Sequence, residues 1–260
     1  MQNNIKIYLY VLVMTSISAA VLSFLYNVLD PLQAKNKEDA KKRSILNSLP
    51  DVKADIDFDK TVKITLLDAT GKVIFTQKED TKTEDIDKQM AELNKRGQGV
   101  KYGKLIDVDL ALEEKFPLDK RIYPVYSYVS AGKTTQIVSI RGSGLWDKIW
   151  GFISMDYKDG KWTISGVNFE HKAETPGLGA EIKDSKDFKD QFKGKQIYDD
   201  AGKYVSVAVV KVPKNKNWEV KSISGSTVTS VGVSEMMNRG ISYYLPYLDA
   251  VSGKALTEKK

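Results

Sequence analysis

The longest uncharged stretch of the chain lies near its N-terminus and limits how the chain can fold. Residues 7–29 (IYLYVLVMTSISAAVLSFLYNVL) are 23 residues without a charged side chain, bracketed by Lys6 and Asp30. A bilayer core of about 30 Å needs about 20 such residues in a helix. Tyrosines stand near both ends, where membrane proteins place interfacial aromatic rings. The stretch therefore predicts a retained transmembrane anchor.

A cleaved signal peptide is the alternative, with Ser18-Ala19-Ala20 as the small-residue cleavage site. The apolar run continues well beyond Ala20, and this length favours an anchor. The orientation of the anchor is a separate question. Five basic residues lie within residues 35–43 and only Lys6 precedes the stretch, so charge alone predicts a cytoplasmic domain.

Composition excludes several kinds of site. The 260 residues include no cysteine, so thiol nucleophiles, disulfides, cysteine-ligated zinc and iron–sulfur clusters held by this chain are excluded. The single histidine, His171, excludes a multi-histidine metal site, and no metal is expected. The net charge of +6 comes from 40 basic and 34 acidic residues that are well mixed, so no nucleic-acid partner is expected. Redox chemistry would need an organic cofactor.

The pattern after the anchor predicts an α+β domain with an antiparallel sheet. We divide the chain into the anchor (1–30), an amphipathic helix with the N-terminal α/β part of the soluble domain (31–120), and a C-terminal domain (121–260). The predicted helices cover 32–49, 86–93, 185–192 and 231–248, with a possible kink in the last at Pro246. The predicted strands cover 62–68, 73–77, 122–130, 135–141, 149–157, 162–170 and 204–212.

Three loops are candidates for a ligand site. Residues 222–230 (SISGSTVTS) are small, uncharged and rich in hydroxyls, and they precede the last predicted helix. A helix N-terminus after such a loop binds phosphate through free N–H groups and the helix dipole. Serine and threonine are also the usual N-cap residues, so a helix cap alone explains this loop better when it is considered by itself.

The second loop, residues 170–180 (EHKAETPGLGA), follows a predicted strand, and its glycines suit close approach of the backbone to a planar or phosphorylated ligand. His171 and Glu174 are too few for a closed metal site. The third loop lies in residues 141–151 (RGSGLWDKIWG). Trp150 is expected in the core, and Trp146, after a glycine-rich turn, is expected to face an aromatic ring system.

In this order, GLW, ETPGLG and SGST resemble the NqrC family, the C subunits of bacterial Na+-translocating NADH:quinone oxidoreductases. The resemblance covers nearly the whole chain. The segment GLWDKIWGF favours this family over its paralogue, the G subunit of the Rnf-type electron-transport complex, which has the same flavin-binding domain. The resemblance implies an FMN-binding domain whose flavin is attached by a flavin transferase, with FAD as donor, to the threonine that closes an S/T-G-A-T motif.

That motif corresponds to residues 224–227 here, so Thr227 is the expected acceptor of the phosphoester and Thr229 the runner-up. Two departures are Ser226, where the family has alanine, and Lys221, where an acidic residue is usual. The family assigns no catalytic residue to the chain itself. The remaining residues implied to bind FMN are Leu145, Trp146, Glu174, Thr175, Gly177, Leu178, Gly179, Ser224, Gly225 and Ser226.

The implied function is electron transfer within a membrane complex that couples NADH oxidation and quinone reduction to Na+ export. Its partners would be the other subunits, and its domain would lie on the periplasmic side of the bacterial inner membrane, against the charge count. The alternatives are an Rnf-type subunit, a stand-alone membrane-anchored flavoprotein reductase, and an anchored binding module whose SGST loop only caps a helix.

Overall fold

The computed structural model describes residues 2–50, 56–130 and 132–252. The chain forms two units, residues 1–43 and 44–260. The first unit is most of one helix, α1 (Gln2–Leu46), which continues through Pro31. The sequence predicted two helices, 7–29 and 32–49. A proline removes one N–H donor and kinks a helix, but the long helical segments on both sides keep α1 continuous up to Leu46.

By length and composition, α1 is apolar enough to cross a membrane. Its described side chains are exposed throughout the apolar part. The hydroxyls of Thr15 and Ser18 donate to the carbonyls of Val11 and Met14, 2.9 Å away in each case. These bonds satisfy polar groups inside the helix itself, which an apolar environment requires.

The second unit is built on a six-stranded antiparallel sheet with the strand order β2-β1-β3-β4-β5-β6. Together with its helices this sheet confirms the α+β class. Four of the six strands, β3 to β6, lie side by side in the sheet in the order in which they follow one another in the chain, and the predicted hairpin of β1 and β2 is confirmed. The strands are β1 (Val62–Leu67), β2 (Val73–Thr76), β3 (Tyr123–Ser130), β4 (Lys133–Ser143), β5 (Lys148–Lys158) and β6 (Lys161–His171).

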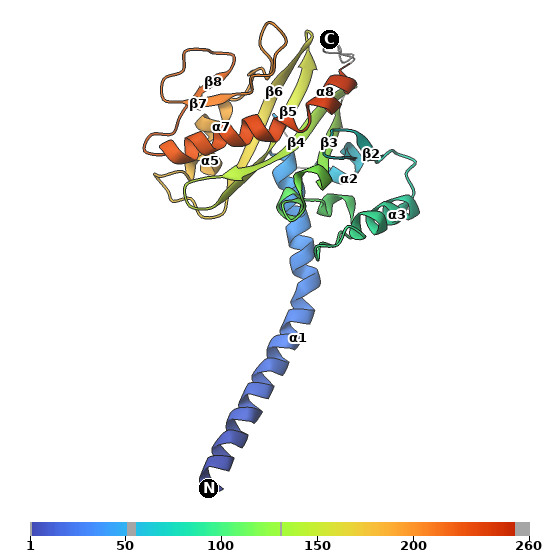
Figure 1. Cartoon of the computed structure of the whole chain (residues 1–260), viewed down its shortest axis with the longest axis vertical. Helices are drawn as coiled ribbons and strands as arrows, with labels where there is room; N and C mark the ends of the chain where they lie inside the picture. The colour runs from blue at the N-terminus through green and yellow to red at the C-terminus, as the bar shows by residue number, and fades with distance from the viewer. Residues whose placement is uncertain (1, 51–55, 131, 253–260) are drawn as a thin grey trace. The chain divides into compact units, whose positions relative to one another are not determined.

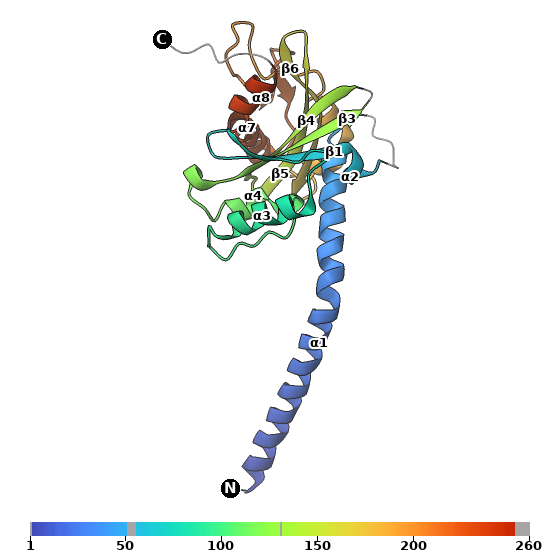
Figure 2. The same cartoon turned by 90° about the vertical axis from the view of Figure 1, so that its right-hand side faces the viewer.

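Two apolar cores lie on the two faces of this sheet. One contains Val233, Met236 and Ile241 of α7 (Thr227–Ser242), which packs on β4 (Figure 1). The other contains Met90 and Leu93 of α3 (Thr83–Asn94). Figure 2 shows α3 on the side of the sheet away from α7, and α4 (Leu110–Glu113) contacts β4. The remaining helices are α2 (Phe58–Thr61), α5 (Glu181–Asp184), α6 (Lys186–Asp190), α8 (Leu245–Val251) and the 3-10 turns η1 (Leu105–Asp107) and η2 (Leu118–Lys120).

Two predicted elements differ from the structure. The strand predicted at 204–212 is reduced to β7 (Ala208–Val210), which pairs in parallel with β8 (Glu219–Lys221). Ser206 interrupts it with a φ of 59°, in the left-handed region that a strand cannot adopt. The sheet joins strands from before and after residue 120, and the domain boundary placed there stays a prediction.

The helix predicted at 231–248 is two helices, α7 and α8, separated at Tyr243 and Tyr244. Pro246 is the reason, because its ring clashes with the carbonyl one turn earlier and it has no N–H to continue α7. Pro246 lies instead in the first turn of α8, where a proline is tolerated. The start of α7 is four residues earlier than predicted, at Thr227, inside the hydroxyl-rich loop.

Candidate functional site

The three loops meet around the carboxylate of Glu174, which is 5% exposed. Its Oε1 accepts the N–H of Trp146 at 3.0 Å, and its Oε2 accepts the N–H of Leu145 at 3.3 Å. The same Oε2 accepts the hydroxyl of Thr229 at 2.6 Å. One side chain of the ETPGLG loop therefore binds both the GLW loop and the first turn of α7.

These hydrogen bonds also determine the ionisation of Glu174. Burial alone would raise the pKa of this carboxyl, but the Thr229 hydroxyl and the N–H groups of Trp146 and Leu145 lower it below its usual value. Donors that point at a carboxylate stabilise its charged form. Glu174 is therefore an anion at neutral pH and accepts all three bonds in that state.

Glycines allow the loops to approach this closely. Gly179 has a φ of +147°, and a Cβ there would lie 2.6 Å from Oγ1 of Thr229 and 2.7 Å from Oε2 of Glu174. Gly225, with a φ of +80°, passes the carbonyl of Gly177 so closely that a Cβ would lie 3.0 Å from it. At both positions only glycine fits without strain.

We expect Gly179→Ala to lower the free energy of unfolding by about 2–4 kcal/mol, because both the backbone strain and the clash must be relieved. Gly177→Ala is the matched control. It has a φ of +79° but nothing within 4 Å of the added Cβ, so only a strain of about 1 kcal/mol is expected. Urea unfolding of the two variants measures the difference, and equal losses would show that the close approach at Gly179 has no energetic consequence.

The N-terminus of α7 leaves donors and a hydroxyl exposed. Ser226 occupies the N-cap position, yet its hydroxyl does not cap the helix and donates instead to the carbonyl of Leu178 at 3.0 Å. Within the described residues, the N–H groups of Thr227, Val228 and Thr229 have no hydrogen-bond partner. A cap is therefore not what the hydroxyls of this loop provide, and the free N–H groups suit an anion.

The two candidate threonines have opposite environments. Thr227 is the first residue of α7 and its side chain is exposed. Thr229 is completely buried, and its hydroxyl is bonded to Glu174 and, at 3.4 Å, to the carbonyl of Leu178. The hydroxyl of Thr227 is therefore accessible from solvent without a change in the loop, and that of Thr229 is not.

Large apolar side chains of the three loops that meet at Glu174 face solvent. Trp146 is 64% exposed, and Leu145, Leu178 and Val228 are exposed as well. Large apolar side chains are usually buried, and a group of exposed ones is typical of a surface that contacts a ligand or another protein. Trp150, expected in the core, is only half-buried, because it pairs across β4 and β5 with Arg141, whose guanidinium lies 5.8 Å from the ring centroid.

The remaining predicted site residues shape the second and third loops. The carbonyl of Thr175 accepts the N–H of Leu178 at 2.9 Å and closes a turn. His171 has a structural contact, since its Nδ1 accepts the N–H of Glu174 at 3.1 Å. Ser224 is exposed and makes no side-chain hydrogen bond with a described residue.

Sequence reasoning missed Glu181. Its carboxylate accepts the N–H groups of Gly177 and, at 3.1 Å, Gly179, and so fixes the glycine turn. The signal available was an acidic residue directly after a glycine-rich loop, in the first turn of a short helix. In the part of the chain that the structure describes, no group of three or more histidine, cysteine, aspartate or glutamate residues is placed to hold a metal ion.

Comparison with known proteins agrees with this geometry. The model of the FMN-binding domain family matches residues 144–242, from the GLW loop to the end of α7. The crystal structure of the C subunit of Na(+)-translocating NADH-quinone reductase from Parabacteroides distasonis is 30% identical, with a TM-score of 0.61, and aligns over 98% of that chain and 89% of this one. The chain belongs to this family, the NqrC family.

Curated members of the NqrC family match a shorter region. The protein from Yersinia pestis is 38% identical over 124 residues, which are 46% of this chain and 45% of that protein. The protein from Pasteurella multocida is 40% identical over 108 residues, 40% of this chain and 39% of that protein. The matched region thus spans less than half the length of these relatives. The crystal structure of Shewanella oneidensis NqrC, 24% identical with a TM-score of 0.62, covers 83% of this chain and 99% of that one and shows the same fold.

Proposed function

We propose that this chain carries FMN covalently on Thr227 and transfers electrons as a subunit of a Na+-translocating NADH:quinone oxidoreductase. The observation that carries the proposal is the exposed hydroxyl of Thr227 at an uncapped helix N-terminus. Phosphate esters are stabilised by such N–H groups and by the helix dipole. Family membership and the match to the FMN-binding domain support the same cofactor.

The residues around Thr227 fit a flavin phosphate and its ring. The free N–H groups of Thr227, Val228 and Thr229 would bind the phosphate oxygens, with Gly225 and Ser226 leaving room at the turn. The exposed apolar side chains of Leu145, Trp146 and Leu178 would contact the ring system. Glu174 and Gly179 would act by holding the loops together. Both carboxylate oxygens of Glu174 already accept hydrogen bonds from the other two loops, and Gly179 has no side chain to contact the cofactor.

When bound, FMN supplies reversible electron transfer, and the protein contributes binding, orientation and electrostatics. The chain would relay electrons between redox centres of neighbouring subunits, with no substrate site of its own, in a complex whose NADH oxidation and quinone reduction drive Na+ export. A flavin transferase would form the Thr227 phosphoester from FAD. Lys221, exposed in β8, would meet that enzyme in place of the family's usual acidic residue.

The test is a denaturing gel of the full chain produced together with a flavin transferase. A phosphoester survives detergent and boiling, so the band should fluoresce under ultraviolet light. The same chain produced without the transferase is the control and should be dark. A dark band in both preparations would remove the proposed attachment.

We further propose that residues 7–29 of α1 anchor the chain in the inner membrane with the domain on the periplasmic side. Long domains translocate largely regardless of flanking charge, and more than 200 residues follow this segment. Lysines that follow the span would contact anionic headgroups. The charge of Lys42 is in addition offset by Glu38, whose Oε1 lies 2.8 Å from its Nζ.

An alkaline phosphatase fused to the C-terminus, which is active only outside the cytoplasm, should therefore be active. A β-galactosidase fusion at the same point is the matched control and should be inactive, because that enzyme folds only inside the cell. The reverse pair of results would show that the basic residues at 35–43 retain the domain in the cytoplasm.

A further inference from the structure

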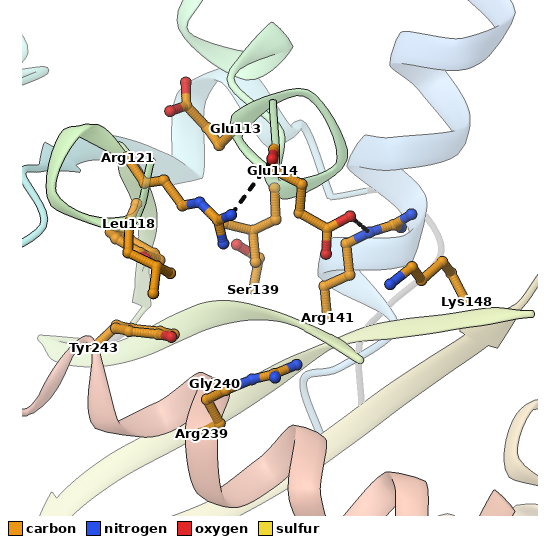
Figure 3. Close-up of a pocket in the computed structure, with 12 residues that line it drawn as sticks. Glu113, Glu114, Leu118, Arg121, Ser139, Arg141, Lys148, Arg239, Gly240 and Tyr243 are labelled. Carbon is orange, nitrogen blue, oxygen red and sulfur yellow. Dashed lines mark hydrogen bonds and ion pairs between the residues drawn. The ribbon is translucent and has the colours of Figure 1, made fainter. Parts of the chain in front are cut away.

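A cavity separate from the proposed flavin site opens between β3 and β4. These strands pair only as far as Val125 and Val138, and the rest of β4 diverges from β3. A cavity of about 510 Å³ lies at this fork, a size typical of small-molecule sites. None of the residues assigned above to the flavin lines it. The lining residues come from α4, η2, β3, β4, β5 and the end of α7 (Figure 3).

Four cationic side chains line the cavity: Arg121, Arg141, Lys148 and Arg239. Figure 3 shows Arg121 and Lys148 extending toward its middle from opposite sides. Only Arg141 has an acidic partner, Glu114, whose Oε2 lies 3.0 Å from its Nε. Among the described residues, the other three make no ion pair with an acidic side chain.

Glu113, the other acid in the lining, does not neutralise these cations. It is completely buried and forms an ion pair with Arg96, with 2.6 Å between Oε1 and Nη2. Its oxygens also accept the hydroxyl of Tyr102 and the N–H of Ile122. The cavity therefore has an excess of positive charge, and mutual repulsion between its cations would be relieved by a bound anion.

Tyr123, which also lines the cavity, has a buried hydroxyl without a partner in the described part of the chain. The side chain of Tyr123 is 3% exposed, and its OH makes no hydrogen bond with any residue that the structure describes. Burial raises the pKa of Tyr123 to about 12, so the hydroxyl is protonated at neutral pH and can donate. A buried donor without an acceptor is costly, and an oxyanion in the cavity would supply one.

The wall beside this hydroxyl is aromatic. The ring of Tyr243 stacks on that of Tyr123, with 4.7 Å between the centroids and 23° between the planes. Leu118, 56% exposed, also lines the cavity. A flat apolar wall next to cationic groups suits a ligand with a planar ring and a charged end.

From these groups we infer that the cavity binds a small organic phosphate, with a dianionic phosphate among the cations of Arg121, Lys148 and Arg239 and a planar ring against Tyr243. Three cations without an acidic partner among the described residues favour a dianion over a singly charged carboxylate, because each adds attraction in a partly buried site. The inference is independent of FMN on Thr227.

Isothermal titration of the full chain with phenyl phosphate tests the site. We expect saturable binding with a Kd below about 1 mM, since an anion paired with several cations in a concave site gains several kcal/mol. Inorganic phosphate, which lacks the ring, should bind at least about fivefold more weakly, a difference within the range that one aromatic contact supplies. Equal affinities would contradict the role of Tyr243.

Arg239→Gln keeps the exposed helix position and removes one cation, so it should weaken binding of phenyl phosphate at least about tenfold. Lys158→Gln is the matched control, because Lys158 lies at the opposite end of the β5 strand from Lys148 and should change the Kd less than about twofold. Absence of saturable binding to the unmodified chain, or an unchanged Kd in Arg239→Gln, would overturn the inference. Flavin fluorescence of both variants should remain at the level of the unmodified chain, and so keeps this test separate from the proposed function.

Discussion

Replacement of Thr227 by alanine is expected to abolish covalent flavin completely. The alanine removes the only exposed threonine hydroxyl of the first turn of α7, while the backbone N–H groups and the neighbouring loops stay in place. Thr227 lies at the helix surface, so the fold should be unaffected. The measurement is in-gel fluorescence of the variant produced with a flavin transferase, normalised to the amount of protein.

Two further variants make this result specific. Thr227→Ser keeps a hydroxyl at the same position and should retain part of the fluorescence. Thr229→Ala removes a buried hydroxyl that bonds to Glu174, so it should cost about 1–2 kcal/mol of stability but retain most of the flavin per folded molecule. Fluorescent Thr227→Ala beside dark Thr229→Ala would mean that the acceptor is misassigned.

Glu174→Ala is expected to have the second large effect, because it removes the acceptor common to the three loops. The buried hydroxyl of Thr229 would lose its strongest partner, and the N–H groups of Leu145 and Trp146 would lose theirs. We expect the free energy of unfolding to fall by about 2–4 kcal/mol and the extent of flavinylation to fall with it. Urea unfolding measures the first and gel fluorescence the second.

Glu174→Gln removes the charge and keeps one acceptor oxygen in place of the two that receive bonds from Trp146 on one side and from Leu145 and Thr229 on the other. The pKa of Glu174 is lower in the folded chain than in the unfolded chain, so its charged state stabilises the fold above the unfolded value of about 4.3. That contribution is lost as the pH falls through the lowered folded pKa. The difference in unfolding free energy between the unmodified chain and Glu174→Gln should therefore be full at pH 7 and shrink below about pH 4. A difference independent of pH would show that the charge does not contribute.

Most of the sheet could be predicted from local signals. The strands alternate or concentrate β-branched and aromatic residues, and turns such as Asp159-Gly160 separate them, so β3 to β6 are found within a few residues of their predicted ends. Local signals fail where one backbone torsion decides the outcome. The positive φ of Ser206 interrupts the β-branched run at 204–212, and no residue type in that run indicates a positive φ.

The candidate site was predictable as three loops but not as one structure. Small and glycine-rich stretches identify each loop, and their order resembles the family. The contacts that join them connect residues far apart in the chain: Glu174 lies 28 residues from Trp146 and 55 from Thr229. The burial that distinguishes Thr229 from Thr227 likewise depends on where α7 begins, which hydrophobic periodicity placed four residues too late.

The most direct test of the central claim is tandem mass spectrometry of one tryptic peptide. Cleavage after Lys221 and Arg239 releases residues 222–239, which include Ser224, Ser226, Thr227 and Thr229. From chain produced with a flavin transferase, the peptide should carry the mass of FMN less one water, with fragment ions that assign the group to Thr227. An unmodified peptide, or a flavin on any other hydroxyl of the peptide, would contradict the account.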